Sequence, residues 1–395
     1  MKPMLVRVPV TQRGIQMKFL HLSDLHIGKR VNEYSMLEDQ KYILTKIINI
    51  IDEHHPDAVI IAGDVYDKSV PSAEAVELFD DFLVRLSQRK LAVFVISGNH
   101  DSPERIAFGA RLMHSSGIYM SPVYDGSITP VEMTDEYGKL KVWMLPFVKP
   151  ALVRKVCQDV LIESYNDAVK AVIDRLSINT SERNILITHQ FVTGSERTES
   201  EEISVGGADN VDVTVFDSFD YTALGHIHRA QNCKSNKVRY CGTPLKYSFS
   251  ESKDQKSVTL VELKQKGTLD VSTAELKPMR DMVEIRGKYD EIMMRDFYQD
   301  TSYQQDYTHI TLTDEDDIPD AIAKLRTVYH NLMKLDYDNL RTRSSSLIDG
   351  AYENEQKSPL EHFAEFYELQ NNQPMSKVQS EFIENLISDI WEGNK

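Results

Sequence analysis

Short apolar runs recur through the first 230 residues, and five of them end in residues that can bind metal ions. One such ending would mean little, because a polar residue must follow a buried strand somewhere. The five endings contain Asp, Asn and His and no Lys, Glu or Ser. Since α/β sheets place their sites just outside the carboxyl ends of the strands, the runs predict strands that meet at one site. The residues at these endings are Asp24, His26, Asp64, Asn99, His100, Asp101, His189, His226 and His228.

Between these runs the apolar positions change to helical spacing. Residues 36–55 and 75–88 show this spacing, and the second of these helices is expected to begin near Ser72. Residues 125–146 alternate in polarity with Gly turns, which indicates antiparallel strands, and helices are expected at about 151–176. The fold class that we predict is α/β, with a two-sheet mixed β sandwich flanked by helices.

The composition changes near residue 278, which places the end of the first predicted domain at 17–277. Residues 278–340 predict a small α+β capping domain with the order β-α-β-α, in which IPDAIAKLRTVYHNLMKL is the last helix. This domain has no ligand cluster. Its single histidines, His309 in a strand and His330 in a helix, are expected to serve ordinary packing.

The C-terminal part of the sequence predicts a polar linker at 341–357 and a helical hairpin at 358–395. Capping boxes begin at Ser358 and Ser376, and Pro359 stands at the favoured first helical position. The hairpin either packs on its own domain or docks on a partner helix, and its aromatic surface favours docking. Its apolar positions are Leu360, Phe363, Phe366, Phe382, Ile383, Leu386, Ile387, Ile390 and Trp391.

The composition is that of an ordinary globular protein with two or three domains: 395 residues, 41% hydrophobic and 27% charged. No apolar run approaches the roughly 20 residues that span a bilayer, and residues 1–16 resemble no signal peptide, so we treat them as an N-terminal extension. Cys157, Cys233 and Cys241 lack metal-binding spacing, which predicts buried thiols and a reducing cytoplasm.

A net charge of −16 argues against unspecific nucleic-acid binding by the whole surface, although a local cationic site is compatible with it. The ligand set of carboxylates, one amide and imidazoles suits Mn, Fe, Zn or Mg. Six or seven ligands are too many for one tetrahedral ion, so they predict two divalent ions that share a carboxylate. Such a pair clamps a phosphoryl group and activates water, which predicts a phosphoesterase.

Spacing within the motifs suggests roles for individual side chains. Asp24 and His26 are two residues apart, so an extended segment would direct both to one face. His100 follows Asn99 directly and points away from it, which suits a proton donor for the leaving oxygen. Asp101 is expected to orient the His100 ring.

The motifs DLH, GDVYD, GNHDSPER, the His of ITHQ and GHIH resemble the signature set of calcineurin-like metallophosphoesterases. GNHDSPER, GGADNVDVTVFDSFDYTALGHIHRAQ and the terminal helices are similar to the SbcD family of bacterial nuclease subunits, counterparts of the archaeal and eukaryotic double-strand-break repair nucleases. The resemblance implies that His100 is catalytic. It implies a first metal on Asp24, His26, Asp64 and His228, and a second on Asp64, Asn99, His189 and His226.

The same resemblance implies Mn²⁺ as the usual ion, a homodimer, and docking of the C-terminal helices on the coiled-coil base of the SMC-like ATPase SbcC. It further implies a DNA exonuclease and a single-strand and hairpin endonuclease that process DNA ends in repair, recombination and replication. Asp67 departs from the archaeal and eukaryotic pattern, which has a histidine there.

Four basic residues stand beside the ligands and either contact phosphates or are solvated surface charges. Because the chain has no GxxxxGK[ST] motif, any ATP must be hydrolysed by another subunit. Two alternatives stay open, a phosphodiesterase for cyclic nucleotides and a non-catalytic scaffold. The first leaves 278–395 without a purpose, and the second would show lost ligands. The four basic residues are Lys29, Arg30, Arg105 and Arg229.

Overall fold

The computed structural model describes residues 17–201, 210–340, 342, 359–371 and 373–392. The chain divides into two compact units, Met1–Asp281 and Met282–Lys395. The predicted N-terminal extension, Ser358 and all but one residue of the predicted linker lie outside the described residues, as do the side chains of Ile390 and Trp391.

The first unit contains two six-stranded mixed sheets, as the sequence predicts. The first sheet has the order β16-β15-β1-β4-β5-β6, and the second has the order β13-β14-β12-β9-β8-β7. The strands of the first sheet are β1 (Met17–Leu22), β4 (Ala58–Ala62), β5 (Ala92–Ile96), β6 (Ile118–Met120), β15 (Ser257–Leu263) and β16 (Leu269–Glu275). Those of the second are β7 (Val131–Asp135), β8 (Gly138–Leu145), β9 (Arg183–His189), β12 (Tyr221–Gly225), β13 (Gln231–Cys233) and β14 (Ser235–Tyr240).

Parallel strands occupy the middle of each sheet and carry the predicted ligands at their carboxyl ends. β1, β4, β5 and β6 are parallel neighbours, as are β14, β12, β9 and β8. The outer strands β7, β13, β15 and β16 are antiparallel to their neighbours. Three ligand-bearing strands therefore lie side by side in one sheet and two in the other.

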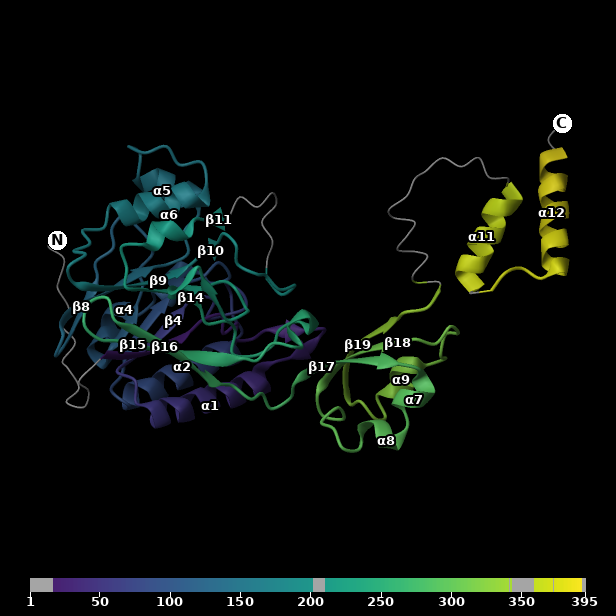
Figure 1. Cartoon of the computed structure of the whole chain (residues 1–395), viewed down its shortest axis with the longest axis horizontal. Helices are drawn as coiled ribbons and strands as arrows, with labels where there is room; N and C mark the ends of the chain where they lie inside the picture. The colour runs from purple at the N-terminus through teal and green to yellow at the C-terminus, as the bar shows by residue number, and fades with distance from the viewer. Residues whose placement is uncertain (1–16, 202–209, 341, 343–358, 372, 393–395) are drawn as a thin grey trace. The chain divides into compact units, whose positions relative to one another are not determined.

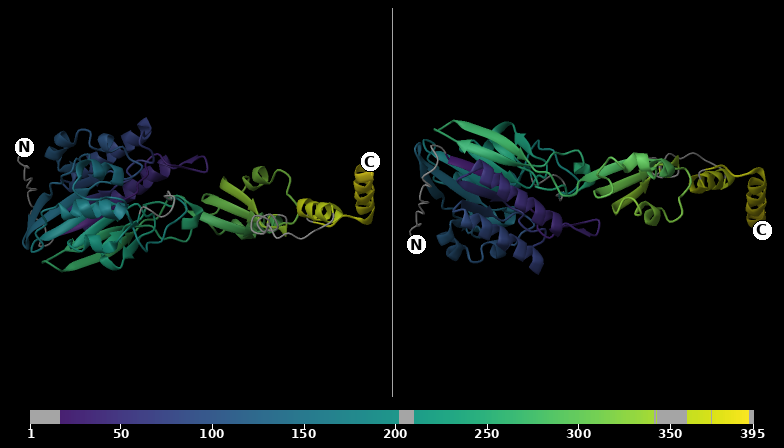
Figure 2. Two further views of the ribbon diagram at one scale, coloured as in Figure 1. Left: turned by 90° about the horizontal axis from the view of Figure 1, so that it is seen from above. Right: turned by 90° about the horizontal axis from the view of Figure 1, so that it is seen from below.

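Apolar residues of both sheets fill the layer between them, and helices cover the outer faces (Figure 1). Helices α1 (Leu37–His54) and α2 (Ala73–Gln88) cover the first sheet, and Figure 2 shows them again from below. Helices α5 (Pro150–Val156) and α6 (Tyr165–Asp174) cover the second. The side chain of Ser72 accepts the N–H of Ala75 (3.3 Å), so α2 begins where the sequence predicts.

Shorter elements complete the first unit. The strand pairs are β2 (Arg30–Val31) with β3 (Tyr34–Ser35), and β10 (Phe191–Val192) with β11 (Asn210–Val211). The short helices are α3 (Pro103–Ile106), α4 (Ala110–Met113), η1 (His114–Ser116), η3 (Val213–Phe216) and η4 (Phe249–Glu251).

The second unit contains a parallel three-stranded sheet, β17 (Met282–Gly287), β18 (Tyr307–Leu312) and β19 (Asn331–Tyr337), with α7 (Tyr289–Ile292), α8 (Arg295–Tyr298) and α9 (Ala321–Leu325). The prediction of one long last helix is wrong. Helix α9 is short, and the following residues form β19, because backbone pairing with β18 outweighs an ambiguous apolar spacing. His330 lies exposed in a turn, so the packing role expected for it is also wrong. His309 lies in β18, where its Nε2 is 2.8 Å from Oδ2 of Asp336.

Two C-terminal helices, α11 (Pro359–Asn371) and α12 (Lys377–Glu392), form the predicted hairpin. The side-chain amide of Gln379 donates to the Tyr367 hydroxyl (2.8 Å) and joins them. The capping box of α12 is present, because the Ser376 N–H donates to the Gln379 side chain (2.8 Å) and the Gln379 N–H to the Ser376 hydroxyl (3.4 Å).

The three cysteines are free and buried, which confirms the prediction of buried thiols. Among the helices in the described part of the chain, none has both the length and the apolar character that crossing a membrane requires.

Candidate metal centre

The turn after β1 brings Asp24 and His26 to the edge where the parallel strands end. Both are buried, and both have a left-handed backbone, with φ of +52° and +43°. The Asp24 N–H donates to the Gly63 carbonyl and the His26 N–H to the Asp64 carbonyl, each at 3.0 Å. The expected extended geometry is therefore wrong. Bonds to the next loop hold this segment in a conformation that costs of order 1 kcal/mol or more per residue and that is concentrated at functional sites.

Asp64 follows β4 and is nearly fully buried, again with a left-handed backbone (φ +48°). Its Oδ1 accepts the backbone N–H of His100 at 2.9 Å. A Cβ atom at Gly98 would overlap the same Oδ1, so the chain after β5 can approach Asp64 only with glycine here.

The second sheet contributes His189, the last residue of β9, and His226, which follows β12. The Nε2 of His189 and the Nδ1 of His226 each lie 2.9 Å from Oδ1 of Asn99. The other ring nitrogen of His189 donates to the Ala62 carbonyl (2.9 Å). A Cβ at Gly225 would overlap that same carbonyl oxygen, so this glycine allows the strand ends of the two sheets to meet.

The last predicted ligand in the sequence, His228, faces His26. Its Nε2 lies 3.1 Å from the Nε2 of His26, and both rings are buried. The Oδ2 of Asp64 lies 3.3 Å from Nε2 of His189 and 3.8 Å from Nε2 of His26. Three sets of donor atoms each lie within 4.8 Å of one another: Asp24 with His26 and His228, Asp24 with Asp64 and His189, and His26 with Asp67 and His100 at the rim.

The donor set fits divalent cations. Ring nitrogens that face each other at 3.1 Å have at most one proton between them, so a cation is the natural partner for their lone pairs. Asn99 likewise presents a carbonyl oxygen to two imidazoles, His189 and His226. Imidazole, amide and carboxylate donors without thiolate suit Mn, Fe, Zn or Mg.

The electrostatics of the cluster also favour cations. Burial holds the pKa values of His26 and His226 well below the usual range, which keeps both rings neutral and able to bind metal. Burial also opposes charge on His189, but the Asp64 and Asp24 carboxylates raise its pKa to about 9. The pKa of Asp64 is lowered in spite of its burial, mainly by His189. The carboxylates thus attract positive charge to the place where the strand ends of the two sheets meet.

His100 lies at the rim, with its side chain 18% exposed and its Nε2 4.0 Å from Oδ2 of Asp64. Its Nδ1 donates to the Asp67 carbonyl (3.1 Å), and this bond, rather than Asp101, orients the ring. The role that the sequence predicts for Asp101 is therefore wrong. Its carboxylate accepts three backbone N–H groups at 2.9 to 3.1 Å and joins the loops after β4 and β5. The donors are Val65, Tyr66 and Gly98.

Two of the four basic residues are held by acidic partners. Lys29 donates to Oδ1 of Asp67 (2.8 Å), so its ammonium is fixed beside the ligand cluster. Arg229 pairs with Asp254 at 3.1 Å and with Glu196 at 2.9 Å. These two carboxylates offset the charge that Arg229 would otherwise offer to a phosphate.

The other two basic residues are exposed. The guanidinium of Arg30 donates to the Glu33 carbonyl in the β2–β3 hairpin. Arg105 lies on α3, directly after the GNHD segment. Of the four, Lys29 is the one that an ion pair holds beside the ligand cluster.

The sequence patterns did not indicate a polar group around His228, formed by Ser200, Glu201, Glu251 and Lys256. Ser200 and Glu201 follow β10, and Glu251 ends η4. These residues stand in no fixed spacing to the GHIH motif, so no local pattern could have indicated them.

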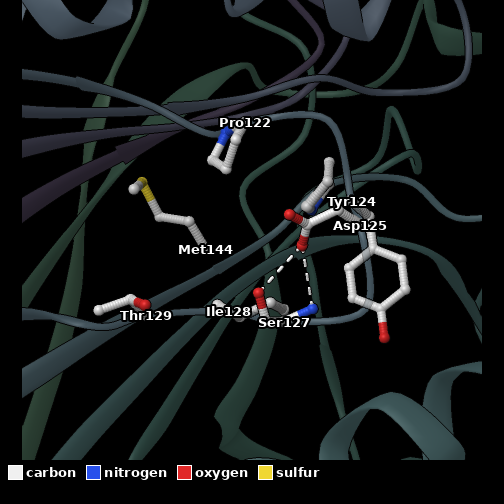
Figure 3. Close-up of a pocket in the computed structure, with 8 residues that line it drawn as sticks. Pro122, Tyr124, Asp125, Ser127, Ile128, Thr129 and Met144 are labelled. Carbon is white, nitrogen blue, oxygen red and sulfur yellow. Dashed lines mark hydrogen bonds between the residues drawn. The ribbon is translucent and has the colours of Figure 1, made fainter. Parts of the chain in front are cut away.

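A separate cavity of about 240 Å³ lies in the first unit (Figure 3). The Asp125 carboxylate accepts the backbone N–H (3.2 Å) and hydroxyl (3.0 Å) of Ser127 at its wall. None of its lining residues is among the predicted site residues. They are Pro122, Tyr124, Asp125, Ser127, Ile128, Thr129, Met144 and Pro146.

Residues 17–230 match the family model described as calcineurin-like phosphoesterase, and residues 278–371 match the model described as type 5 capsule protein repressor C-terminal domain. A Staphylococcus epidermidis protein, named as the SbcD subunit of the nuclease SbcCD, is 31% identical over 381 residues, which are 95% of this chain and 99% of that protein. A solved dimetal phosphatase from Danio rerio is 14% identical, covering 66% of this chain and 99% of that one at a TM-score of 0.39. From the first family model and the Staphylococcus relative we conclude that the chain belongs to the calcineurin-like phosphoesterases and, within them, to the SbcD family of nuclease subunits.

Proposed function

We propose that this protein is the nuclease subunit of an SbcCD complex and that it hydrolyses DNA phosphodiester bonds at two divalent metal ions. The ion that we propose for both sites is Mn²⁺. The observation that carries the proposal is the convergence of ligand atoms from five strand ends of two sheets. One ion would be held by Asp24, His26, Asp64 and His228, and the other by Asp64, Asn99, His189 and His226.

When bound, a pair of divalent ions polarises the phosphoryl group and supplies a water nucleophile at neutral pH. The chain's own residues provide orientation and a proton. Nδ1 of His100 donates to the Asp67 carbonyl, and Nε2 is the nitrogen that faces the cluster. As an imidazolium, with a proton on each ring nitrogen, His100 can give the Nε2 proton to the leaving oxygen and keep the bond to Asp67. Lys29 donates to the side chain of Asp67, and His100 donates to the backbone carbonyl of the same residue. The Lys29 ammonium is therefore held near His100, where it can contact a phosphate.

DNA is the substrate that fits an acidic chain with a locally cationic site. Two divalent ions exceed the charge of Asp24 and Asp64, so the loaded site attracts phosphate although the net charge is −16. The 31% identical relative is named as a nuclease subunit of SbcCD. We infer exonuclease action on double strands and endonuclease action on single strands and hairpins, in DNA repair, recombination and replication.

The other regions take their roles from this assignment. We propose that 17–277 is the nuclease domain and 278–340 a capping domain that contacts DNA. The residues at 341–357 would link it to the hairpin 358–395, which would dock on the coiled coil of an SbcC-type SMC-like ATPase. A DNA substrate and three free thiols support a cytoplasmic location.

The test of the nuclease assignment is Mn²⁺-dependent cleavage of single-stranded and hairpin DNA by the full chain and by His100→Ala. Loss of a general acid should lower the rate by roughly 10²- to 10⁴-fold, while Mn²⁺ binding stays unchanged because His100 is outside both ligand sets. His330→Ala, an exposed histidine of the second unit, is the matched control. Wild-type protein that leaves DNA intact but hydrolyses a cyclic nucleotide would contradict the assignment.

We further propose a homodimer that forms through the segment around α4. Phe108 and Leu112, four residues apart, are each 81% exposed, and neighbouring exposed apolar side chains indicate an interaction site where a single one does not. Replacing both by Glu should shift the protein from dimer to monomer in light scattering after size exclusion. Leu161→Glu, at a site that is 78% exposed, is the control and should remain dimeric. A wild-type protein that is monomeric at micromolar concentration would refute the dimer.

A further inference from the structure

His228 is held at three points by polar groups from other segments, of which Glu201 and Lys256 are buried and Ser200 is half-buried. Its backbone N–H donates to Oε1 of Glu201 (2.6 Å), and its carbonyl accepts from Nζ of Lys256 (3.0 Å). Its ring Nδ1 lies 2.6 Å from the hydroxyl oxygen of Ser200. Main chain and ring are therefore both fixed.

The Ser200 hydroxyl connects this ring to a buried ion pair. Its oxygen lies 2.6 Å from Oε1 of Glu251, whose other oxygen lies 2.5 Å from the ammonium of Lys256. Glu251 is fully buried and Lys256 is 6% exposed. A buried ion pair of this kind often adds little net stability relative to apolar residues, so its presence calls for another reason.

The direction of these bonds follows from counting protons. A carboxylate paired with an ammonium has no proton to give, so Ser200 must donate its single proton to Glu251. If Ser200 instead donated to His228, two oxygens would face each other at 2.6 Å without a proton between them. The Ser200 oxygen therefore accepts a proton from Nδ1 of His228, and Thr198 contacts the same oxygen at 2.8 Å.

A proton on Nδ1 leaves Nε2 of His228 without one. That nitrogen is the atom that lies 3.1 Å from Nε2 of His26, in the donor group with Asp24. A bare ring nitrogen is the form that binds a metal ion, and a hydrogen bond at the other nitrogen is what selects it.

We propose that Ser200 and Glu251 are positioning residues for the first metal site and, with Lys256, form a relay that keeps His228 in its metal-binding tautomer. Residues 198–201, which carry no ligand themselves, are thereby tied to the metal centre. The inference rests on the proposed function only for the statement that His228 binds a metal ion. The tautomer of His228 can be measured without metal or DNA.

The experiment compares Ser200→Ala with the rescue variant Ser200→Thr, which keeps the hydroxyl, and with Ser181→Ala as a matched control. Ser181 makes an equivalent local bond, to Asn179 (2.7 Å), in an exposed loop. All are made in the full chain, and thermal melting without metal confirms folding. Calorimetric titration with Mn²⁺ should give two ions per chain for wild type. In Ser200→Ala one of the two should bind roughly 10- to 100-fold more weakly, and Ser200→Thr should restore most of this loss.

The second readout is the ¹⁵N spectrum of histidine-labelled, metal-free protein, with the His228 signals assigned from His228→Gln. Wild type should show a single Nδ1–H tautomer, and Ser200→Ala should lose it. An Nε2–H tautomer in wild type, or two tight Mn²⁺ sites in Ser200→Ala, overturns the relay. Two tight sites and the expected tautomer in a wild type that fails to cleave DNA would leave the relay standing and contradict the nuclease assignment alone.

Discussion

Replacing Asp64 by Asn is expected to lower Mn²⁺-dependent DNA cleavage by on the order of 10³-fold, the effect of losing several kcal/mol of transition-state stabilisation. Its carboxylate faces one histidine of each proposed metal site, with Oδ2 3.3 Å from Nε2 of His189 and 3.8 Å from Nε2 of His26. The amide has nearly the same shape, and its oxygen can still accept the His100 N–H. The substitution therefore removes the charge that both ions would share and leaves the loop in place.

Asp52→Asn is the matched control, because the same substitution there removes a surface carboxylate that pairs with Arg89 (2.6 Å). It should cleave DNA like wild type. Equilibrium dialysis should show fewer than two Mn²⁺ ions per chain for Asp64→Asn. If this variant kept two tightly bound ions and cleaved DNA within tenfold of wild type, Asp64 would not be the shared ligand.

The position of the site was predictable because its signal is local. A buried parallel strand must be apolar along its length, so the first polar residues after it mark its carboxyl end. His189 and Asn99 are 90 residues apart in the sequence, yet one ends the parallel strand β9, the other follows the parallel strand β5, and they meet at 2.9 Å. The sandwich was predictable for a similar reason, since alternating and continuous apolar runs indicate antiparallel and buried parallel strands.

The backbone geometry and the contacts around the ligands were not predictable from these patterns. The left-handed conformations of Asp24 and His26 are held by bonds to a loop about 40 residues later. The Asp101 carboxylate accepts hydrogen bonds from three backbone N–H groups and none from the His100 ring. That the two residues are adjacent in the sequence therefore predicted the wrong partner for Asp101. Such contacts depend on how distant loops meet, which no spacing within a motif encodes.

The same limit explains the one element that was assigned wrongly. Residues 331–337 have apolar positions compatible with either a helix or a strand, and their parallel pairing with β18 decides the outcome. The Nε2 of His309 on β18 lies 2.8 Å from Oδ2 of Asp336 on β19, so this pairing also satisfies a polar side chain.

Deleting residues 358–395 is expected to abolish binding of an SbcC-type coiled coil. In α11, Phe363 and Phe366 are 36% and 56% exposed, and in α12 Phe382 and Leu386 are 67% and 44% exposed. Aromatic side chains of this kind, presented on paired helices, are typical anchors for a partner helix. Replacing Phe366 and Phe382 together by Glu should weaken binding at least about 100-fold, since two anchors of about 2 kcal/mol each are lost.

Asn385→Glu is the control that distinguishes the loss of the apolar contact from the effect of an added negative charge. Asn385 is exposed on α12, and at 3.6 residues per turn it lies roughly 130° around the helix from the centre of the apolar positions, so a carboxylate there should leave binding within about threefold. Binding is measured by calorimetry with the coiled-coil base of the ATPase. Every proposed metal ligand lies in the first unit, so Mn²⁺-dependent cleavage of single-stranded DNA by the deleted chain should persist. Association that survives the deletion would show that the ATPase binds elsewhere, whereas cleavage lost with the hairpin would mean that the two units act together in catalysis.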